Sequence, residues 1–167
     1  MMTLRAVKFA AAIVLALGAA ACSSNKDGLA DGAGSGFTSG GAATPGSAQD
    51  FVVNVGDRVF FETDSTDLTP TAVATLDKQA QWLQRYPHYT FILEGHADER
   101  GTREYNFSLG ARRSQVVRDY LSSRGIAGSR IRTVSYGKER PVAVCNDISC
   151  WSQNRRAVTV LDGGAGM

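Results

Sequence analysis

Residues 94–113, EGHADERGTREYNFSLGARR, place an acidic, glycine-containing loop directly in front of a helix. At about 3.6 residues per turn, Leu109, Val116 and Val117 fall on one side of that helix, which must face the core. Arg113 lies within this apolar stripe, four residues after Leu109 and three before Val116. Because a charge in such a position is costly unless it is paired or hydrogen-bonded, Arg113 needs a partner.

The acid that the sequence offers to Arg113 is Asp98, in the loop just before the helix. One interpretation is a buried salt bridge between Arg113 and Asp98 that only holds the loop to the helix. The other is a binding site, because a fixed cation and a fixed anion that face one point suit a zwitterionic ligand. Helix geometry alone leaves both interpretations open.

The spacing of apolar residues and the helix-capping residues outside this stretch predict two main helices and four strands. Thr69 and Thr102 are typical N-caps, and Pro70 suits the first position of the first helix. The predicted helices are residues 70–85 and 104–124, and the predicted strands are residues 57–62, 90–94, 131–136 and 157–161. The order β-α-β-α-β-β indicates an α+β sandwich, with both helices packed on one mixed sheet. Residues 141–153 read as an irregular insertion.

The chain divides into four parts by composition. Residues 1–21 have a basic start, a short apolar run and small residues before Cys22, which is the layout of a secretory signal. Residues 22–50 are rich in Gly, Ala and Ser and read as a flexible tether that follows a lipidated Cys22. Residues 51–162 form the domain, and residues 163–167 a loose tail. A cleaved signal followed by an incidental cysteine is the alternative.

Loss of residues 1–21 changes the charge balance. It removes Arg5 and Lys8, which takes the 18 basic residues to 16, equal to the 16 acidic residues. A mature chain with no net positive charge is not expected to bind nucleic acid in general. With Cys22 lipidated, Cys145 and Cys150 remain, and in an oxidising periplasm they can form a small-loop disulfide; two free thiols are the alternative.

Four motifs occur in order along the domain: GHADERGTREYN (95–106), SLGARR (108–113), VSYGKERP (134–141) and NRRAVTV (154–160). Together they resemble the OmpA-like peptidoglycan-binding domain over about residues 55–161. With the lipoprotein signal and the tether, the whole chain resembles the peptidoglycan-associated lipoprotein family of the Tol-Pal system.

This resemblance implies a site for meso-diaminopimelate, the diamino acid of the peptidoglycan stem peptide. By motif position, Asp98 would take the ammonium of the ligand, and Arg113 would take its carboxylate as a two-pronged clamp. Asn106 and Leu109 match further family positions, and Asp64 matches an acid on the pocket rim. The sequence departs from the family at Thr63, where an aromatic residue is usual, and at Arg103, where many members have proline.

The resemblance also implies a biological role. It predicts a non-enzymatic outer-membrane lipoprotein on the periplasmic face, without a cofactor, that tethers the outer membrane to peptidoglycan in envelope integrity and cell division. Ser23 after the lipidated cysteine favours sorting to the outer membrane. TolB and TolA are the protein partners that the family implies.

Three other interpretations fit parts of the sequence. A metal-dependent enzyme could use Glu94, His96 and Asp98, which alternate along an extended segment. A flagellar stator-type protein could carry the same ligand domain, but it needs a spanning helix with a proton-carrying acid, and residues 9–17 are too short. A structural lipoprotein could bind protein partners only.

Overall fold

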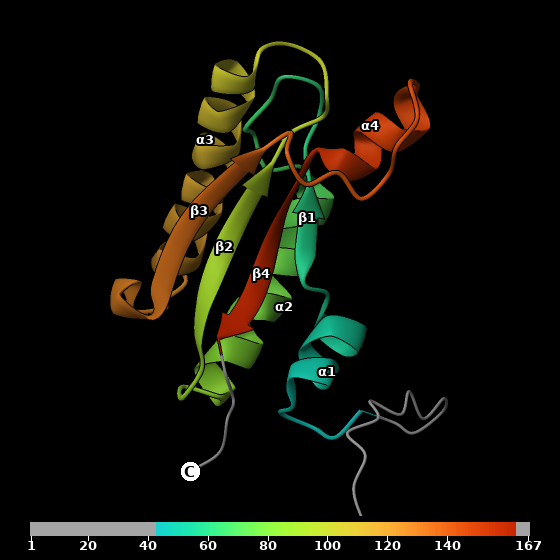
Figure 1. Ribbon diagram of the computed structural model, residues 1–167. Coiled ribbons are helices and arrows are strands. Elements are labelled where there is room, and N and C mark those ends of the chain that lie inside the picture. The colour runs from blue at the N-terminus through green and yellow to red at the C-terminus, as the bar shows by residue number, and fades with distance from the viewer. Residues whose placement is uncertain (1–42, 163–167) are drawn as a thin grey trace, which may run out of the picture. The chain divides into compact units, whose positions relative to one another are not determined.

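The computed structural model describes residues 43–162, so the predicted leader, Cys22 and the tail at 163–167 lie outside the described residues. Its centre is a four-stranded sheet in the order β1-β4-β2-β3, with the two long helices on one face (Figure 1). The strands are β1 (Arg58–Phe60), β2 (Thr90–His96), β3 (Ile131–Gly137) and β4 (Arg156–Asp162). Because β2 runs parallel to β3 and antiparallel to β4, the sheet is mixed, which confirms the predicted α+β class.

Both long helices begin where the sequence predicts. Helix α2 spans Pro70–Arg85, and the Thr69 hydroxyl accepts a hydrogen bond from the backbone N–H of Ala72 at 3.1 Å. Helix α3 spans Arg103–Ser123, and the Thr102 hydroxyl accepts one from the backbone N–H of Tyr105 at 3.2 Å. Side-chain caps of this kind satisfy backbone donors that the first turn leaves free, so they fix the first residue of each helix.

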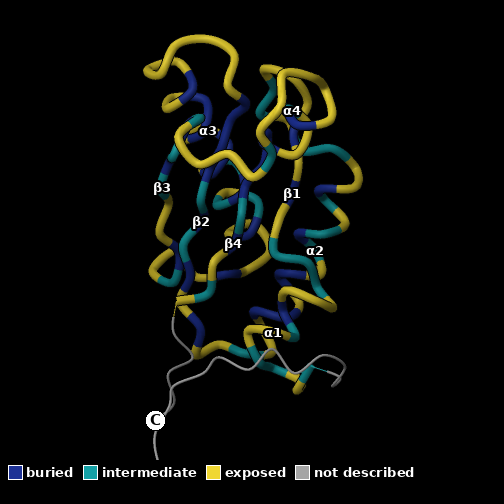
Figure 2. The backbone as a smooth tube through the Cα atoms, turned by 45° about the vertical axis from the view of Figure 1, so that its right-hand side comes forward, coloured by how far each residue is buried: buried dark blue, intermediate teal, exposed yellow. Residues whose placement is uncertain are grey.

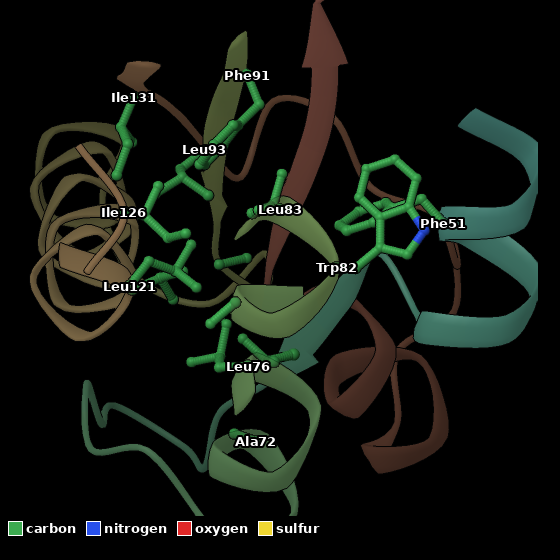
Figure 3. Packing of buried hydrophobic residues seen from close by; sticks show 14 of the residues in the cluster. Phe51, Ala72, Leu76, Trp82, Leu83, Phe91, Leu93, Leu121, Ile126 and Ile131 are labelled. Carbon is green, nitrogen blue, oxygen red and sulfur yellow. The ribbon is translucent and has the colours of Figure 1, made fainter. Parts of the chain in front are cut away.

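The core lies between these helices and the sheet. Along β2, buried residues alternate with less buried ones from Thr90 to Gly95, as the twofold period of a strand requires. Leu76 and Leu83 of α2 face the sheet beside Phe91 and Leu93 of β2, and all four are at most 1% exposed (Figure 3). Each such side chain contributes roughly 1.5–3 kcal/mol on leaving water, so this layer is the main source of stability.

Two glycines let α3 approach β2 closely. A Cβ atom at Gly95 would lie 1.8 Å from the carbonyl oxygen of Gly110, a distance that no side chain can occupy. The backbone of α3 therefore touches the backbone of β2. This contact brings the first turns of α3 up to the loops that follow β1 and β2.

The segment before the domain boundary differs from the sequence prediction. Residues 46–50, placed in the flexible tether, pack on the domain and continue through α1 (Ala48–Asp50) into the single π-helical turn η1 (Phe51–Val55). The Asp50 carboxylate accepts the indole N–H of Trp82 at 2.8 Å, and the Tyr89 hydroxyl donates to the carbonyl of Gly46 at 2.9 Å. The tether prediction is therefore wrong for these residues, because tertiary contacts order a segment whose composition alone would leave it flexible.

The insertion at residues 141–153 is also more regular than predicted, since it contains the short helix α4 (Ile148–Asn154). The Asp147 carboxylate caps this helix, and the predicted disulfide joins Cys145 to Cys150. Helix α4 lies at the end of the sheet where the loops after β1 and β2 meet, whereas α1 lies at the opposite end (Figures 1 and 2). Within residues 43–162, none of the helices has the length and apolar character needed to cross a membrane.

Candidate ligand-binding site

A cavity of about 230 Å³ lies between the loop after β1, the loop after β2 and the first turns of α3. The five residues that the sequence predicts for the site, Asp64, Asp98, Asn106, Leu109 and Arg113, all line it. Pockets for drug-sized ligands are usually about 300–1,000 Å³, so this cavity suits one end of a larger molecule. Its lining also contains Thr63, beside the rim residue Asp64, together with Arg100, Gly101 and Tyr105, which were not predicted for the site.

Arg113 does not form a salt bridge with Asp98, so of the two interpretations the purely structural salt bridge is wrong. Its side chain is 0% exposed and donates to three backbone carbonyls instead. The partners are Ser65 at 2.9 Å from Nε, His96 at 2.8 Å from Nη1 and Glu62 at 3.1 Å from Nη2. Arg113 thus ties α3 to both loops at this end of the sheet, and it does so through backbone groups that no sequence pattern identifies.

The guanidinium of Arg113 keeps donors for a ligand. It has five N–H groups, and the three carbonyls take one each from Nε, Nη1 and Nη2, which leaves one hydrogen on each terminal nitrogen. Burial, and next the nearby charge of Arg155, lower the pKa of Arg113 to about 10. The group is still a cation at neutral pH, and these two hydrogens are not used by the three carbonyls.

Asp98 is the anion of the cavity, and two other arginines hold it. Its carboxylate lies 2.6 Å from Nη2 of Arg100 and 3.4 Å from Nη1 of Arg155, and the residue is 7% exposed. Burial acts to raise the pKa of this carboxyl, but hydrogen bonds from Arg100 and Arg155 outweigh it and leave the pKa below its usual value. Asp98 is therefore ionised at neutral pH.

Few features of the sequence indicate that these two arginines contact Asp98. Arg155 comes from the far end of the domain, 57 residues from Asp98, and only the fold brings the two together. Arg100 is two residues from Asp98, where the chain is irregular and spacing predicts no contact. The motif NRRAVTV was the one available signal for Arg155.

The rim and wall of the cavity are built by the remaining predicted residues. Asp64 has φ 54°, a left-handed conformation that aspartate tolerates, and the Tyr105 hydroxyl donates to its carboxylate. The Asn106 side chain, 2% exposed, donates to the carbonyl of Arg100 at 2.7 Å and so fixes the loop that carries Asp98. Leu109 is 4% exposed and supplies an apolar wall.

The alternative metal set does not assemble. His96 is 2% exposed and lies 3.5 Å from the Glu94 carboxylate, but Asp98 is engaged by Arg100 and Arg155. In residues 43–162, three potential His, Cys, Asp or Glu ligands never gather at one point. Burial, followed by the charges of Arg156, Arg140 and Arg58, lowers the pKa of His96 to about 4, so its ring is neutral.

The sequence matches a known family over most of the domain. The sequence model of the OmpA family matches residues 60–155, which is more than half of the chain. The chain belongs to the OmpA family. The structure of this OmpA-family chain is accordingly similar to the crystal structure of the peptidoglycan-associated lipoprotein from Burkholderia pseudomallei, with a TM-score of 0.62 and 40% identity, over 64% of this chain and 90% of that one.

A curated relative of this OmpA-family chain is the peptidoglycan-associated lipoprotein of Rhizobium meliloti (strain 1021), 67% identical over 93% of this chain and 87% of the relative. A more distant structural match is the C-terminal domain of Helicobacter pylori MotB, with a TM-score of 0.61, 21% identity, and coverage of 65% of this chain and 86% of that one. At that identity the MotB match shows the shared fold alone. The predicted resemblance to peptidoglycan-associated lipoproteins is confirmed.

Proposed function

We propose that this chain binds peptidoglycan non-covalently, through the meso-diaminopimelate of the stem peptide. The observation that carries the proposal is that Asp98 and Arg113, one anion and one cation, line the same small cavity at the start of α3. The names of the relatives, peptidoglycan-associated lipoprotein, support peptidoglycan as the polymer that is bound.

The chemistry of recognition follows from the partners of each charge. The free amino-acid end of diaminopimelate carries an ammonium and a carboxylate on one carbon. The ammonium binds Asp98 and displaces Arg100 from it, while Arg155 stays on the carboxylate. The carboxylate of the ligand accepts the two remaining hydrogens of Arg113, a geometry that lysine cannot reproduce. Binding alone accounts for these residues, so we propose no enzymatic step.

The rest of the chain extends this function to a tether. Lipid on Cys22 would hold the protein on the periplasmic face of the outer membrane, and more than one acyl chain would make that anchoring stable. The residues between Cys22 and the domain would supply reach. Many copies that bridge the two surfaces would give avidity even if each contact is weak. TolB and TolA are the protein partners that the family resemblance suggests, in envelope integrity and cell division.

The test is a calorimetric titration of the chain from residue 23 onward. A muropeptide that contains diaminopimelate should bind, and its lysine-containing analogue, which lacks the second carboxylate, should not. Arg113→Lys should abolish binding, whereas Arg112→Lys, at an exposed neighbouring position, should leave it unchanged. Equal affinity for the two muropeptides would refute the proposed recognition of the amino-acid end.

A further inference from the structure

Arg100 controls access to the anion of the cavity. Its side chain is 40% exposed and bonds to both oxygens of the Asp98 carboxylate, at 3.2 Å from Nε and 2.6 Å from Nη2. Any ammonium that binds Asp98 must first displace this guanidinium. The contacts that Arg100 makes after it leaves Asp98 therefore contribute to the binding free energy.

A second contact already holds Arg100 from its other side. The central guanidinium carbon lies 4.1 Å from the centroid of the Trp151 ring, within the range of a cation–π interaction. The indole N–H of Trp151 also donates to the carboxylate of Glu99, the residue just before Arg100. One side chain of α4 therefore contacts two consecutive residues of the loop that carries Asp98.

The position of Trp151 depends on the loop before α4, which a disulfide and side-chain hydrogen bonds hold in place. A seven-residue helix is not stable in isolation, so α4 needs support from outside its own hydrogen bonds. The Cys145–Cys150 disulfide ties the preceding loop to the residue next to Trp151. At the other end of α4, the Asn154 side chain accepts from the N–H of Val142 at 2.9 Å and donates to the carbonyl of Ala143 at 2.8 Å.

We propose that α4, stabilised by the Cys145–Cys150 disulfide, presents Trp151 as the partner that holds Arg100 once the ligand ammonium has displaced it from Asp98. When the ligand ammonium takes Asp98, Arg100 remains stacked on Trp151 at the mouth of the cavity, beside the carboxylate of the bound amino-acid end. Trp151 is thus a positioning residue for the site, and the disulfide insertion has a role in binding. This inference rests on the proposed function, because the ligand is the one whose ammonium binds Asp98.

The first test replaces the aromatic ring of Trp151. Trp151→Leu removes both the aromatic face and the N–H, and it should weaken binding of the diaminopimelate muropeptide about three- to tenfold, the range of a partly exposed cation–π contact. Trp151→Phe keeps a face for Arg100 and should restore most of the affinity. Ile148→Ala, at a position of α4 that is 61% exposed, is the matched control and should change nothing. Wild-type affinity in a folded Trp151→Leu protein would overturn the proposal.

A double-mutant cycle tests whether Trp151 acts through Arg100. In an Arg100→Gln background, Trp151→Leu should cause no further loss of affinity, because the group that it positions is already gone. If Trp151→Leu weakened binding equally with and without Arg100, Trp151 would act on the ligand or on the fold directly. That outcome would contradict the positioning role.

The disulfide is tested without relying on the ligand. The double variant Cys145→Ser, Cys150→Ser should shift the amide NMR signals of Glu99, Arg100 and Gly101 in the unliganded protein, and it should weaken muropeptide binding as Trp151→Leu does. Unchanged amide signals would overturn the proposal even if the wild type bound no muropeptide. Absence of binding by the wild type would instead refute the proposed function, so the two failures are distinguishable.

Discussion

The two ends of the domain bury their side chains in different ways. Near α1, Phe51 and Tyr89 pack against Trp82, with ring centroids 4.9 and 5.2 Å from the Trp82 ring. Near α4, the buried side chains include the charges of Arg113 and Asp98, each held by hydrogen bonds. Stability comes from apolar area at the first end and from satisfied polar groups at the second.

This difference shows how a binding site is prepared in advance. At the polar end, folding has already removed the charges from water and fixed their directions, so a ligand does not have to order them. The partners of Asp98 can be exchanged for those of a ligand, whereas the aromatic contacts of the other end have no such substitute. Changes at the polar end should therefore affect binding, whereas changes at the aromatic end should affect stability alone.

The largest effect is expected from Arg113→Ala. It leaves the carbonyls of Glu62, Ser65 and His96 without their donor, and the loss of a buried charged partner should cost about 3–5 kcal/mol of unfolding free energy. Muropeptide binding should be lost as well. Urea unfolding measures the first effect and calorimetry the second. Arg112→Ala, on the exposed side of α3, is the control and should stay within about 0.5 kcal/mol of the wild type.

At the apolar end, Phe51→Ala should cost about 3 kcal/mol of unfolding free energy, because it leaves a cavity beside Trp82. Binding should be unchanged at temperatures where the variant is folded. Thermal unfolding and calorimetry on the same sample check both statements. A fall in affinity for this folded variant would break the comparison, since it would show that the two ends are coupled.

Asp98→Asn should act mainly on binding. The amide keeps the shape of the side chain but removes the charge that pairs with the ligand ammonium, so affinity should fall at least about tenfold. The stability cost should be smaller, about 1–2 kcal/mol, because Arg100 can turn to water while Arg155 loses its ionic partner. Asp119→Asn, on the exposed face of α3, is the matched control. Normal binding by Asp98→Asn would remove Asp98 from the site.

The last effect appears only at acid pH and is a pH dependence of stability from His96. Its pKa is lowered to about 4, from 6.5 in the unfolded chain, so the unfolded state takes up a proton more readily than the folded state. The neutral ring contributes its full stability above pH 6.5, and that contribution is lost as the pH falls toward about 4. Urea midpoints across this range should fall more steeply for the wild type than for His96→Met. Parallel curves would exclude His96 as the cause.

Local signals were enough to predict most of the framework. The Thr69 and Thr102 caps and the proline at position 70 define helix starts within a few residues of sequence, and the structure places α2 and α3 there within one residue. The predicted strand ranges also match β2, β3 and β4 within two residues at each end. These features depend on neighbours in the chain, which is why the sequence contains them.

Most of the failures involve contacts between distant parts of the chain. The Gly46–Asp50 segment depends on Trp82 and Tyr89, so its composition could not predict its order. Helix α4 was missed for another reason, because its seven residues are too few to show a helical period. At the site, the charges that line the cavity were predicted but their partners were not. Arg113 binds backbone carbonyls. Every residue has a backbone carbonyl, so the sequence does not indicate which ones an arginine will bind.

The position of α1 has a mechanical consequence. The described chain enters the domain beside Trp82, at the end of the sheet opposite the cavity (Figure 1). Tension between an anchor upstream of residue 43 and a ligand in the cavity would therefore run lengthwise along the strands. Hydrogen bonds between strands lie across that direction, so such a pull would shear many of them together instead of unzipping them one by one. A domain with its chain entry and its cavity at opposite ends of the sheet resists force along the strands, which is the direction in which a tether would pull.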